Sequence, residues 1–197
     1  MKIYLASKSP RRNELLKQME VPFELLSVDA PEIVKPNERP EEYSTRVTQE
    51  KLHAARDKII NENLHYLPVL CADTEVVLNG KILGKPRDED DAFNMLRQYS
   101  GQSHQVITSV GLIYKDYETI RMNTTWVTFA KMSDEVIRHY LASDNYKDKS
   151  GAYGIQSYIG QFISRIDGCF YSVMGLPLNT VREMLNDCFA QINDELR

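Results

Sequence analysis

The stretch Leu5-Ala6-Ser7-Lys8-Ser9-Pro10-Arg11-Arg12 joins two kinds of secondary structure near the start of the chain. Residues 1–4 before it are typical of the start of a buried strand, whereas the apolar spacing of residues 15–19 after it is helical. Ser9 suits the N-cap of that helix, and Pro10 suits its first position, where a missing N–H costs nothing. The sequence therefore predicts a strand, a tight polar turn and a helix N-terminus, which together form an α/β unit.

The same turn gathers groups that bind anions. A helix N-terminus presents unpaired N–H groups and a partial positive charge. Arg11 and Arg12 add guanidinium groups that can hold phosphate oxygens in pairs, and Ser7 and Ser9 add hydroxyls. The segment by itself leaves a second interpretation open, in which the helix is simply capped and both arginines are solvated.

The composition is that of a globular protein with a substantial core. The chain has 197 residues, of which 42% are hydrophobic and 26% charged, so it can form one domain or two small lobes around a cleft. A formal net charge of −4 argues against broad nucleic-acid binding and suits a small polyanion held at a few turns. The three cysteines are too widely spaced for a disulfide framework or a zinc site. No apolar run reaches the ~18 residues of a membrane span, and no signal peptide is recognisable, so we expect a cytoplasmic protein without membrane or nucleic-acid partners.

The rest of the chain alternates between strand and helix patterns. Asn79-Gly80 predicts a tight hairpin turn, and polar loops are expected at residues 29–36 and 143–156. The expected strands cover residues 23–28, 67–78, 81–83, 106–114, 118–130 and 161–166. The expected helices cover residues 10–19, 40–63, 89–99, 134–142 and 178–192.

Asp73 is a carboxylate inside the most apolar run of the chain, residues 67–78. Burial of a carboxylate is costly unless the group is paired or bound to a cation, so Asp73 needs a partner, for which backbone groups are one alternative. Arg46, Glu50 and Lys51 form a charged cluster in the helix expected before this strand, and a cluster of this kind is also typical of a solvated helix face.

Taken together, the unusual polar positions favour hydrolysis of a phosphate ester or phosphoanhydride. Cations can neutralise a polyphosphate, carboxylates can bind a divalent metal, and one carboxylate can accept a proton from the attacking water. The chain contains no Gly-x-x-x-x-Gly-Lys-Ser/Thr loop, Gly-x-Ser-x-Gly elbow or His-Glu-x-x-His pair, so the enzyme classes that use them fit poorly. His104 has no other ligand candidates near it and is expected to be a structural hydrogen bonder. The cations are Arg11, Arg12, Lys51, Lys85 and Lys149, and the carboxylates are Glu32 and Asp73.

Seven segments, in order and over nearly the whole chain, resemble the successive motifs of the Maf family of nucleotide pyrophosphatases. They are residues 6–12, Glu50-Lys51, Ala72-Asp73-Thr74, Gly84-Lys85-Pro86, residues 100–104, residues 148–156 and Gly175-Leu176-Pro177. The resemblance implies an α/β fold similar to that of inosine triphosphate pyrophosphatases, with a long mixed sheet, flanking helices and two lobes around a central cleft, formed by residues 1–197 as a single domain. It also implies hydrolysis of nucleoside triphosphates to monophosphate and pyrophosphate with a divalent metal, Mg²⁺ first and Mn²⁺ or Co²⁺ as alternatives, by a homodimer.

Three positions narrow the resemblance to the members that act on dTTP and UTP. Arg11, Thr74 and Gln156 match those members, whereas the members that act on 7-methyl-GTP carry Trp in place of Arg11. A glutamine amide offers both a donor and an acceptor, so it can pair with the O4 acceptor and N3–H donor that thymine and uracil share. Cytosine and purines would leave that amide without its partners and are expected to be poor substrates. The resemblance thus implies a dTTP/UTP pyrophosphatase with a house-cleaning role in the nucleotide pool.

The resemblance also assigns roles to single residues. Asp73 is the expected catalytic proton acceptor, and Asp73 and Glu32 are the expected metal ligands. Two other interpretations stay open, namely a nucleotide-binding regulator of cell division and septum formation that acts through a protein partner, and an enzyme of this class whose target is a modified pyrimidine triphosphate. The expected substrate-binding residues are Ser7, Ser9, Arg11, Arg12, Lys51, Thr74, Lys85 and Gln156.

Overall fold

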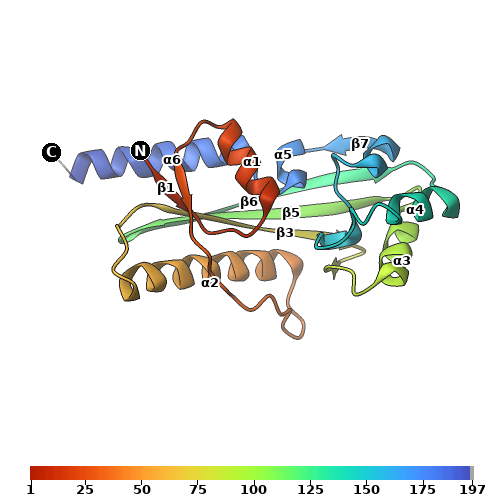
Figure 1. Ribbon diagram of the computed structural model, residues 1–197, viewed down its shortest axis with the longest axis horizontal. Coiled ribbons are helices and arrows are strands. Elements are labelled where there is room, and N and C mark those ends of the chain that lie inside the picture. Colours follow the sequence, from red (N-terminus) through yellow and green to blue (C-terminus); the bar gives the residue numbers. More distant parts are fainter. Residues whose placement is uncertain (196–197) are drawn as a thin grey trace. The chain divides into compact units, whose positions relative to one another are not determined.

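A computed structural model describes residues 1–195 and contains a seven-stranded mixed sheet flanked by helices, which confirms the predicted α/β class (Figure 1). The strand order is β2-β1-β3-β5-β6-β7, and β4 pairs with β3. The strands are β1 (Ile3–Leu5), β2 (Phe23–Leu25), β3 (Val69–Leu78), β4 (Lys81–Leu83), β5 (Ser103–Tyr114), β6 (Tyr117–Phe129) and β7 (Ile163–Asp167). The helices are α1 (Pro10–Gln18), α2 (Pro40–Asn61), α3 (Glu89–Tyr99), α4 (Asp134–Leu141), α5 (Phe170–Met174) and α6 (Leu178–Glu195), with 3₁₀ turns η1 (Ser150–Ala152) and η2 (Tyr158–Phe162).

Most of the predicted elements are confirmed, and the differences lie at strand ends and in short helices. β5 begins at Ser103 rather than at residue 106, and there the Ser103 hydroxyl pairs across the sheet with the Thr128 hydroxyl at 2.7 Å. The strand expected over residues 161–166 begins only at Ile163, because η2 occupies the residues before it. Helix α5 was not predicted, since five residues are too few to display a helical period.

The chain divides into two compact units. The first consists of residues 1–73 and 108–122 and the residues from Gly175 onward, and the second consists of residues 74–107 and 123–174. Strands β3, β5 and β6 each continue from one unit into the other. The single catalytic domain and the central cleft remain predictions. Among the described residues, none of the helices combines the length and the apolar character needed to cross a bilayer.

In the first unit, α2 covers one face of the sheet, and α1 and α6 cover the other (Figure 1). Gly111 on β5 allows α2 to approach closely, because a Cβ atom at this position would lie 2.6 Å from Leu52 Cδ1 and 2.9 Å from Thr48 Cγ2. A buried hydrogen bond of 2.8 Å from the Ser44 hydroxyl to the Ser109 hydroxyl fixes the same contact. This packing fixes the distance and the position of α2 relative to β5, and therefore also the position of the polar side chains on α2.

The second unit is built around a buried aromatic cluster of Tyr99, His104, Phe129 and Tyr153. His104 Nε2 lies 2.6 Å from the Tyr153 hydroxyl, and burial lowers the pKa of this histidine to about 4. The imidazole is therefore neutral near pH 7, and the prediction that His104 is a structural hydrogen bonder is confirmed. Gly151 in η1 has φ of +70°, and a Cβ atom there would lie only 2.7 Å from the Tyr99 hydroxyl oxygen.

Candidate functional site

The polar turn between β1 and α1 has the predicted form. Pro10 is the first residue of α1, and the Ser9 hydroxyl accepts a hydrogen bond of 3.5 Å from the Arg12 backbone N–H. The Ser9 N–H in turn donates to the Ser7 hydroxyl at 3.1 Å. Both serines thus shape the turn, and Arg11 lies partly exposed in the first turn of the helix. The predicted anion-binding groups are therefore gathered at one helix N-terminus.

Arg12 is oriented by the segment that precedes α6. Its Nε donates to the Gly175 carbonyl at 2.8 Å, and its Nη1 lies 3.5 Å from the Ser7 hydroxyl. The segment Gly175-Leu176-Pro177 carried no predicted role, although it belongs to the motif set. The contact shows that this segment, just before α6, fixes the direction of the Arg12 guanidinium.

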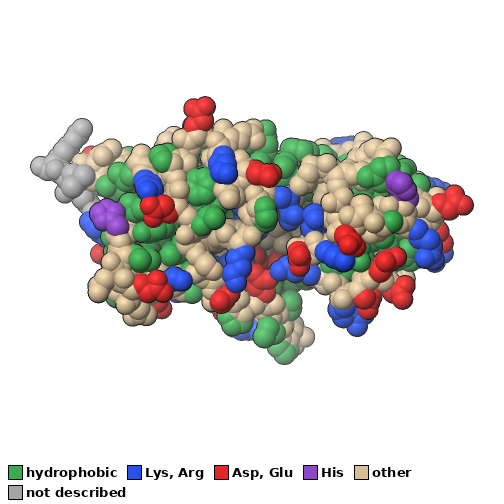
Figure 2. Space-filling view, in the orientation of Figure 1, with side chains coloured by type: hydrophobic (Ala, Val, Ile, Leu, Met, Phe, Trp, Pro, Cys, Tyr) green, Lys and Arg blue, Asp and Glu red, His purple; other side chains and the backbone are tan. Residues whose placement is uncertain are grey.

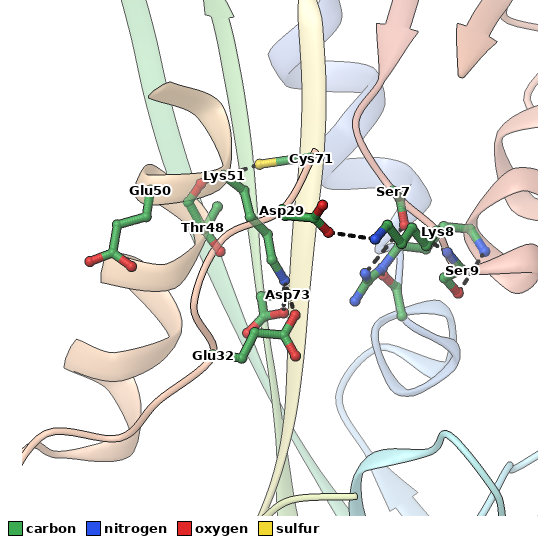
Figure 3. A network of polar contacts seen from close by, with 12 residues as sticks. Ser7, Lys8, Ser9, Asp29, Glu32, Thr48, Glu50, Lys51, Cys71 and Asp73 are labelled. Carbon is green, nitrogen blue, oxygen red and sulfur yellow. Dashed lines mark hydrogen bonds and ion pairs between the residues drawn. The ribbon is translucent and has the colours of Figure 1, made fainter. Parts of the chain in front are cut away.

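Lys51 on α2 is the centre of the acidic part of the site. Its Nζ donates to Asp73 Oδ1 at 2.5 Å and to Glu32 Oε1 at 2.7 Å, and Figure 3 shows the lysine directed at both carboxylates. The side chains of Lys51 and Asp73 are only 12% and 7% exposed, whereas that of Glu32 is 42% exposed. Burial lowers the pKa of the Lys51 ammonium, but the two carboxylates outweigh burial and the net shift is upward. A charged lysine therefore supplies the partner that the buried Asp73 requires.

The turn and the acidic group meet beside the same part of β3. β1 runs parallel to β3 with Leu5 opposite Leu70, so the turn that follows β1 lies next to residues 71–73. Burial raises the pKa of the Cys71 thiol to about 12, although the nearby positive charges of Lys51 and Arg12 both act to lower it. Cys71 is thus an inert core residue of this part of β3.

A further ion pair connects the two loops of this unit. Lys8 Nζ contacts Asp29 Oδ1 at 2.5 Å, which links the polar turn to the loop that carries Glu32 (Figure 3). Both side chains are exposed, so the pair is weak and can open. Neither residue was predicted to belong to the site, because two exposed charges at a separation of 21 residues give no local signal.

The predicted site residues are divided between the two units. The first unit brings together Ser7, Ser9, Arg11, Arg12, Glu32, Lys51 and Asp73. Thr74, Lys85 and Gln156 belong to the second unit, and Thr74 follows Asp73 directly in β3.

Within the second unit, two loops bring Lys85 and Gln156 into neighbouring segments. The Gly151 N–H donates to the Gly84 carbonyl at 3.0 Å, which ties the segment of Lys85 to the glycine-containing loop. In that loop, a Cβ atom at Gly154 would lie 3.3 Å from Gln156 Oε1 and 3.2 Å from Lys149 Cε. Gly154 therefore leaves space in which the side chains of Gln156 and Lys149 lie close together.

The pairing around Lys51 also bears on metal binding. Asp73 and Glu32 face one cationic position, and Mg²⁺ is commonly held by one or two carboxylates together with substrate phosphates. The donor set therefore fits such an ion. Across residues 1–195, no three or more His, Cys, Asp or Glu side chains are grouped so that they could hold a metal by themselves.

Comparison with known proteins places the chain in a family. A family model described as Maf-like protein matches residues 2–188. The dTTP/UTP pyrophosphatase of Escherichia coli (strain K12) is 44% identical over 185 residues, which cover 94% of this chain and 92% of that protein, and the enzyme of the same name from Shigella sonnei gives the same values. The dTTP/UTP pyrophosphatase of Nitrosomonas europaea is 42% identical over 193 residues, which cover 94% and 93%. A match of this extent, together with the geometry of the turn and of the Lys51 group, leads to one conclusion: the chain belongs to the Maf family.

Proposed function

We propose that this protein is a nucleotide pyrophosphatase that hydrolyses dTTP and UTP to the nucleoside monophosphate and pyrophosphate. The observation that carries the proposal is the meeting of Lys51, Asp73 and Glu32 beside the turn of residues 7–12. This arrangement combines cations for a polyphosphate with a buried carboxylate that can take a proton. The names of the similar enzymes support the same substrates.

The polar turn and α2 bind the triphosphate in this proposal. Ser7, Ser9 and the N–H groups at the start of α1 donate to phosphate oxygens, while Arg12 keeps its direction through the Gly175 carbonyl. Lys51 moves its ammonium from the carboxylates toward the phosphates when the substrate arrives, and Lys85 adds a further cation. Each contact favours the charge that develops on the phosphate oxygens as the bond breaks.

Asp73 is the proposed proton acceptor. A water molecule attacks the α-phosphorus and the bond from this phosphorus to the bridging oxygen breaks. Pyrophosphate then leaves with the bond electrons, and the proton of the water passes to the Asp73 carboxylate. Before the substrate binds, the ammonium of Lys51 lies 2.5 Å from Asp73 Oδ1, and its movement toward the phosphates frees this oxygen to accept the proton.

Glu32 and Asp73 would hold the divalent cation. Mg²⁺ is our first choice, with Mn²⁺ or Co²⁺ as alternatives, and when bound it would neutralise charge on the triphosphate. The two residues differ in burial, with Asp73 inside β3 and Glu32 in an exposed loop. In this proposal Asp73 is the ligand that β3 holds in place, and Glu32 is the ligand that can change its position with the loop.

Base selectivity is assigned to Arg11, Thr74 and Gln156. The Gln156 amide is exposed and can present its donor and acceptor to the O4 and N3–H groups of thymine or uracil. The same edge occurs in modified pyrimidines such as 5-methyluracil, so a modified pyrimidine triphosphate is also a proposed substrate. We further propose a homodimer in the cytoplasm with a house-cleaning role in the nucleotide pool and without nucleic-acid or membrane partners.

The test is a panel of dTTP, UTP, 5-methyl-UTP, CTP and GTP with Mg²⁺, with chromatographic identification of the products. We expect monophosphate and pyrophosphate from the first three, and in ¹⁸O-labelled water we expect the label in the monophosphate, because the attack is at the α-phosphorus. Formation of diphosphate and inorganic phosphate, or entry of the label into pyrophosphate, would contradict the proposal.

Two variants locate the chemistry. Asp73→Asn is expected to lose at least about 100-fold in kcat with an unchanged circular dichroism spectrum, because an amide cannot accept the proton. Asp57→Asn is the matched control, since Asp57 is an exposed carboxylate on α2 that contacts only Arg56 at 3.6 Å among the ion pairs found in residues 1–195. Full activity of Asp73→Asn would remove the central residue from the mechanism.

A further inference from the structure

Arg46 on α2 donates hydrogen bonds from all three of its guanidinium nitrogens, whereas a solvated helix face was one interpretation of its charged cluster. Its side chain is only 19% exposed. Nε donates to Glu38 Oε1 at 2.6 Å, and Nη2 donates to Glu38 Oε2 at 2.8 Å and to the Ile33 carbonyl at 2.9 Å. Nη1 donates to both oxygens of Glu50 at 3.0 and 3.1 Å, and the guanidinium lies over the Tyr43 ring at 5.5 Å. The solvated-face interpretation is therefore wrong for this residue.

These contacts join α2 to the loop that carries Glu32. Glu38 and the Ile33 carbonyl both belong to the chain between β2 and α2, and the Glu38 carboxylate also accepts from the Lys35 N–H at 2.9 Å. The hydrogen bonds from Arg46 lower the pKa of Glu38 to about 2, so this carboxylate stays ionised. One guanidinium thus closes residues 33–38 into a compact turn beside α2.

Hydrophobic packing contributes little to the position of this loop. An open groove of about 330 Å³ lies between part of the loop and α2, with Pro31 and Ile33 on the loop side and Arg46 and Ala54 on the helix side. The Ile33 side chain is 71% exposed, and Figure 2 shows hydrophobic side chains on the surface of the projecting loop that lies below α2 in Figure 1. With the apolar side chains turned outward, the loop depends on its polar contacts.

The other polar ties of the loop are weaker than that of Arg46. Lys8 and Asp29 form an exposed ion pair, and the Glu32 end of the Lys51 contact is 42% exposed. Exposed single pairs contribute little, whereas a bidentate guanidinium pair with low exposure adds both strength and direction. Lysine in place of Arg46 has one ammonium and cannot hold Glu38 by two oxygens while it also binds the Ile33 carbonyl.

We propose that Arg46 is a positioning residue that holds the loop of residues 29–38 against α2 so that Glu32 reaches the Lys51–Asp73 pair. This inference rests on the proposed function of that pair. Arg46 contacts neither substrate nor metal in this scheme, and it acts only through the loop. Its loss therefore leaves Asp73 and Lys51 in place and releases Glu32.

The first experiment measures the loop directly, by amide hydrogen exchange in the full chain without nucleotide. In Arg46→Ala, the amides of residues 29–38 are expected to exchange at least about tenfold faster than in the wild type, while those of β3 do not change. Arg39→Ala is the matched control, since Arg39 precedes the same helix and pairs with Glu42 at an exposed position. Equal exchange of the loop in the wild type and Arg46→Ala would overturn the proposal.

The second experiment is a double-mutant cycle with dTTP. Loss of an outer residue that orients a metal ligand commonly costs about 10- to 100-fold, so Arg46→Ala should lower kcat/KM in this range and raise the Mg²⁺ concentration for half-maximal activity. Because Arg46 acts through Glu32, the double variant with Glu32→Gln should be no slower than Glu32→Gln alone. Arg46→Lys should recover part of the loss. Multiplicative losses in the double variant would show that Arg46 acts by another route and would overturn the proposal.

A third variant covers the case in which Arg46→Ala does not fold. Glu38→Gln keeps the shape of the Arg46 partner and removes its charge, and it should give the same faster loop exchange and the same shift in Mg²⁺ dependence in smaller amount. The proposed function and this inference can fail separately. A wild-type protein that does not hydrolyse dTTP or UTP would refute the function, whereas the exchange of residues 29–38 would still decide whether Arg46 holds the loop.

Discussion

Replacement of Lys51 by methionine removes the ammonium that neutralises Asp73 while it keeps a side chain of similar length. Removal of one partner from a buried ion pair costs about 3–5 kcal/mol, because a buried charge is left uncompensated. Glu32 is 42% exposed and can be hydrated, so the loss is set by Asp73, which is 7% exposed. We therefore expect Lys51→Met to lose about 3 kcal/mol of unfolding free energy at pH 7, the low end of this range.

Urea denaturation followed by circular dichroism measures this loss. With a dependence on urea of about 2 kcal/mol per M, a loss of about 3 kcal/mol lowers the unfolding midpoint by about 1.5 M. Lys58→Met is the control on the same helix, because Lys58 contacts Glu62 only at 3.6 Å and donates to the Ser27 carbonyl near the surface. The control should lose less than about 1 kcal/mol.

A double-mutant cycle and added Mg²⁺ sharpen the test. Combination of Lys51→Met with Asp73→Asn removes the uncompensated charge, so the pair should be coupled by about 2 kcal/mol. Mg²⁺ should stabilise Lys51→Met more than the wild type, because the ion can take the position between Asp73 and Glu32 that the ammonium leaves. A midpoint of Lys51→Met equal to that of Lys58→Met, or a coupling near zero, would refute the electrostatic account of this site.

Three further changes test other parts of the structure. Neutral His104 stabilises the fold above its unfolded pKa of 6.5, and this stabilisation is lost as the pH falls toward the folded pKa of about 4. Urea titrations across this pH range should show a loss of about 3 kcal/mol of unfolding free energy. The variant His104→Gln should lack this pH dependence, and its persistence there would contradict the assignment. Gly111→Ala should destabilise the protein by about 1–3 kcal/mol in thermal unfolding and slow turnover, because the new methyl group displaces Leu52 and with it α2, which carries Lys51. An unchanged melting temperature would contradict the close packing of α2 on β5. Gln156→Leu should lower kcat/KM for dTTP about 100-fold. Gln161→Leu is the control and should have no effect, because the Gln161 side chain is exposed and its amide donates only to a backbone carbonyl of the same turn. Equal kcat/KM values for the two variants would exclude the Gln156 amide as the group that recognises the base.

Local chemistry determined the secondary structure that frames the site. Ser9 and Pro10 begin α1, as the sequence predicted, and the side chains of Asp88 and Ser133 cap α3 and α4 in the same local way. Asn79-Gly80 makes the hairpin between β3 and β4 with φ of +51° and +74°, as expected for a tight turn that requires positive φ. Such features were predictable because each depends on residues within a few positions of one another.

The sequence also indicated single side chains of the site. Asp73 was singled out because a carboxylate in an apolar strand needs a partner, and the order of the motifs indicated the family that the comparisons then showed. The identity of that partner was not predictable. Lys51 is separated from Asp73 by 22 positions and from Glu32 by 19, and backbone groups were an alternative partner that the sequence left open.

Only the tertiary structure decided how the site is supported. The Arg12 guanidinium takes its direction from a carbonyl 163 positions away. Arg46 is largely withdrawn from solvent because the loop before α2 folds back over it. Lys51 reaches β3 because Gly111, on a third segment, lets α2 come close. Sequence patterns report the face and the ends of each element, since these follow from neighbouring residues. The pairing of charged side chains depends on the parallel register of β1 with β3 and on how closely α2 packs on the sheet. Both arise only when segments that are distant in the sequence are assembled.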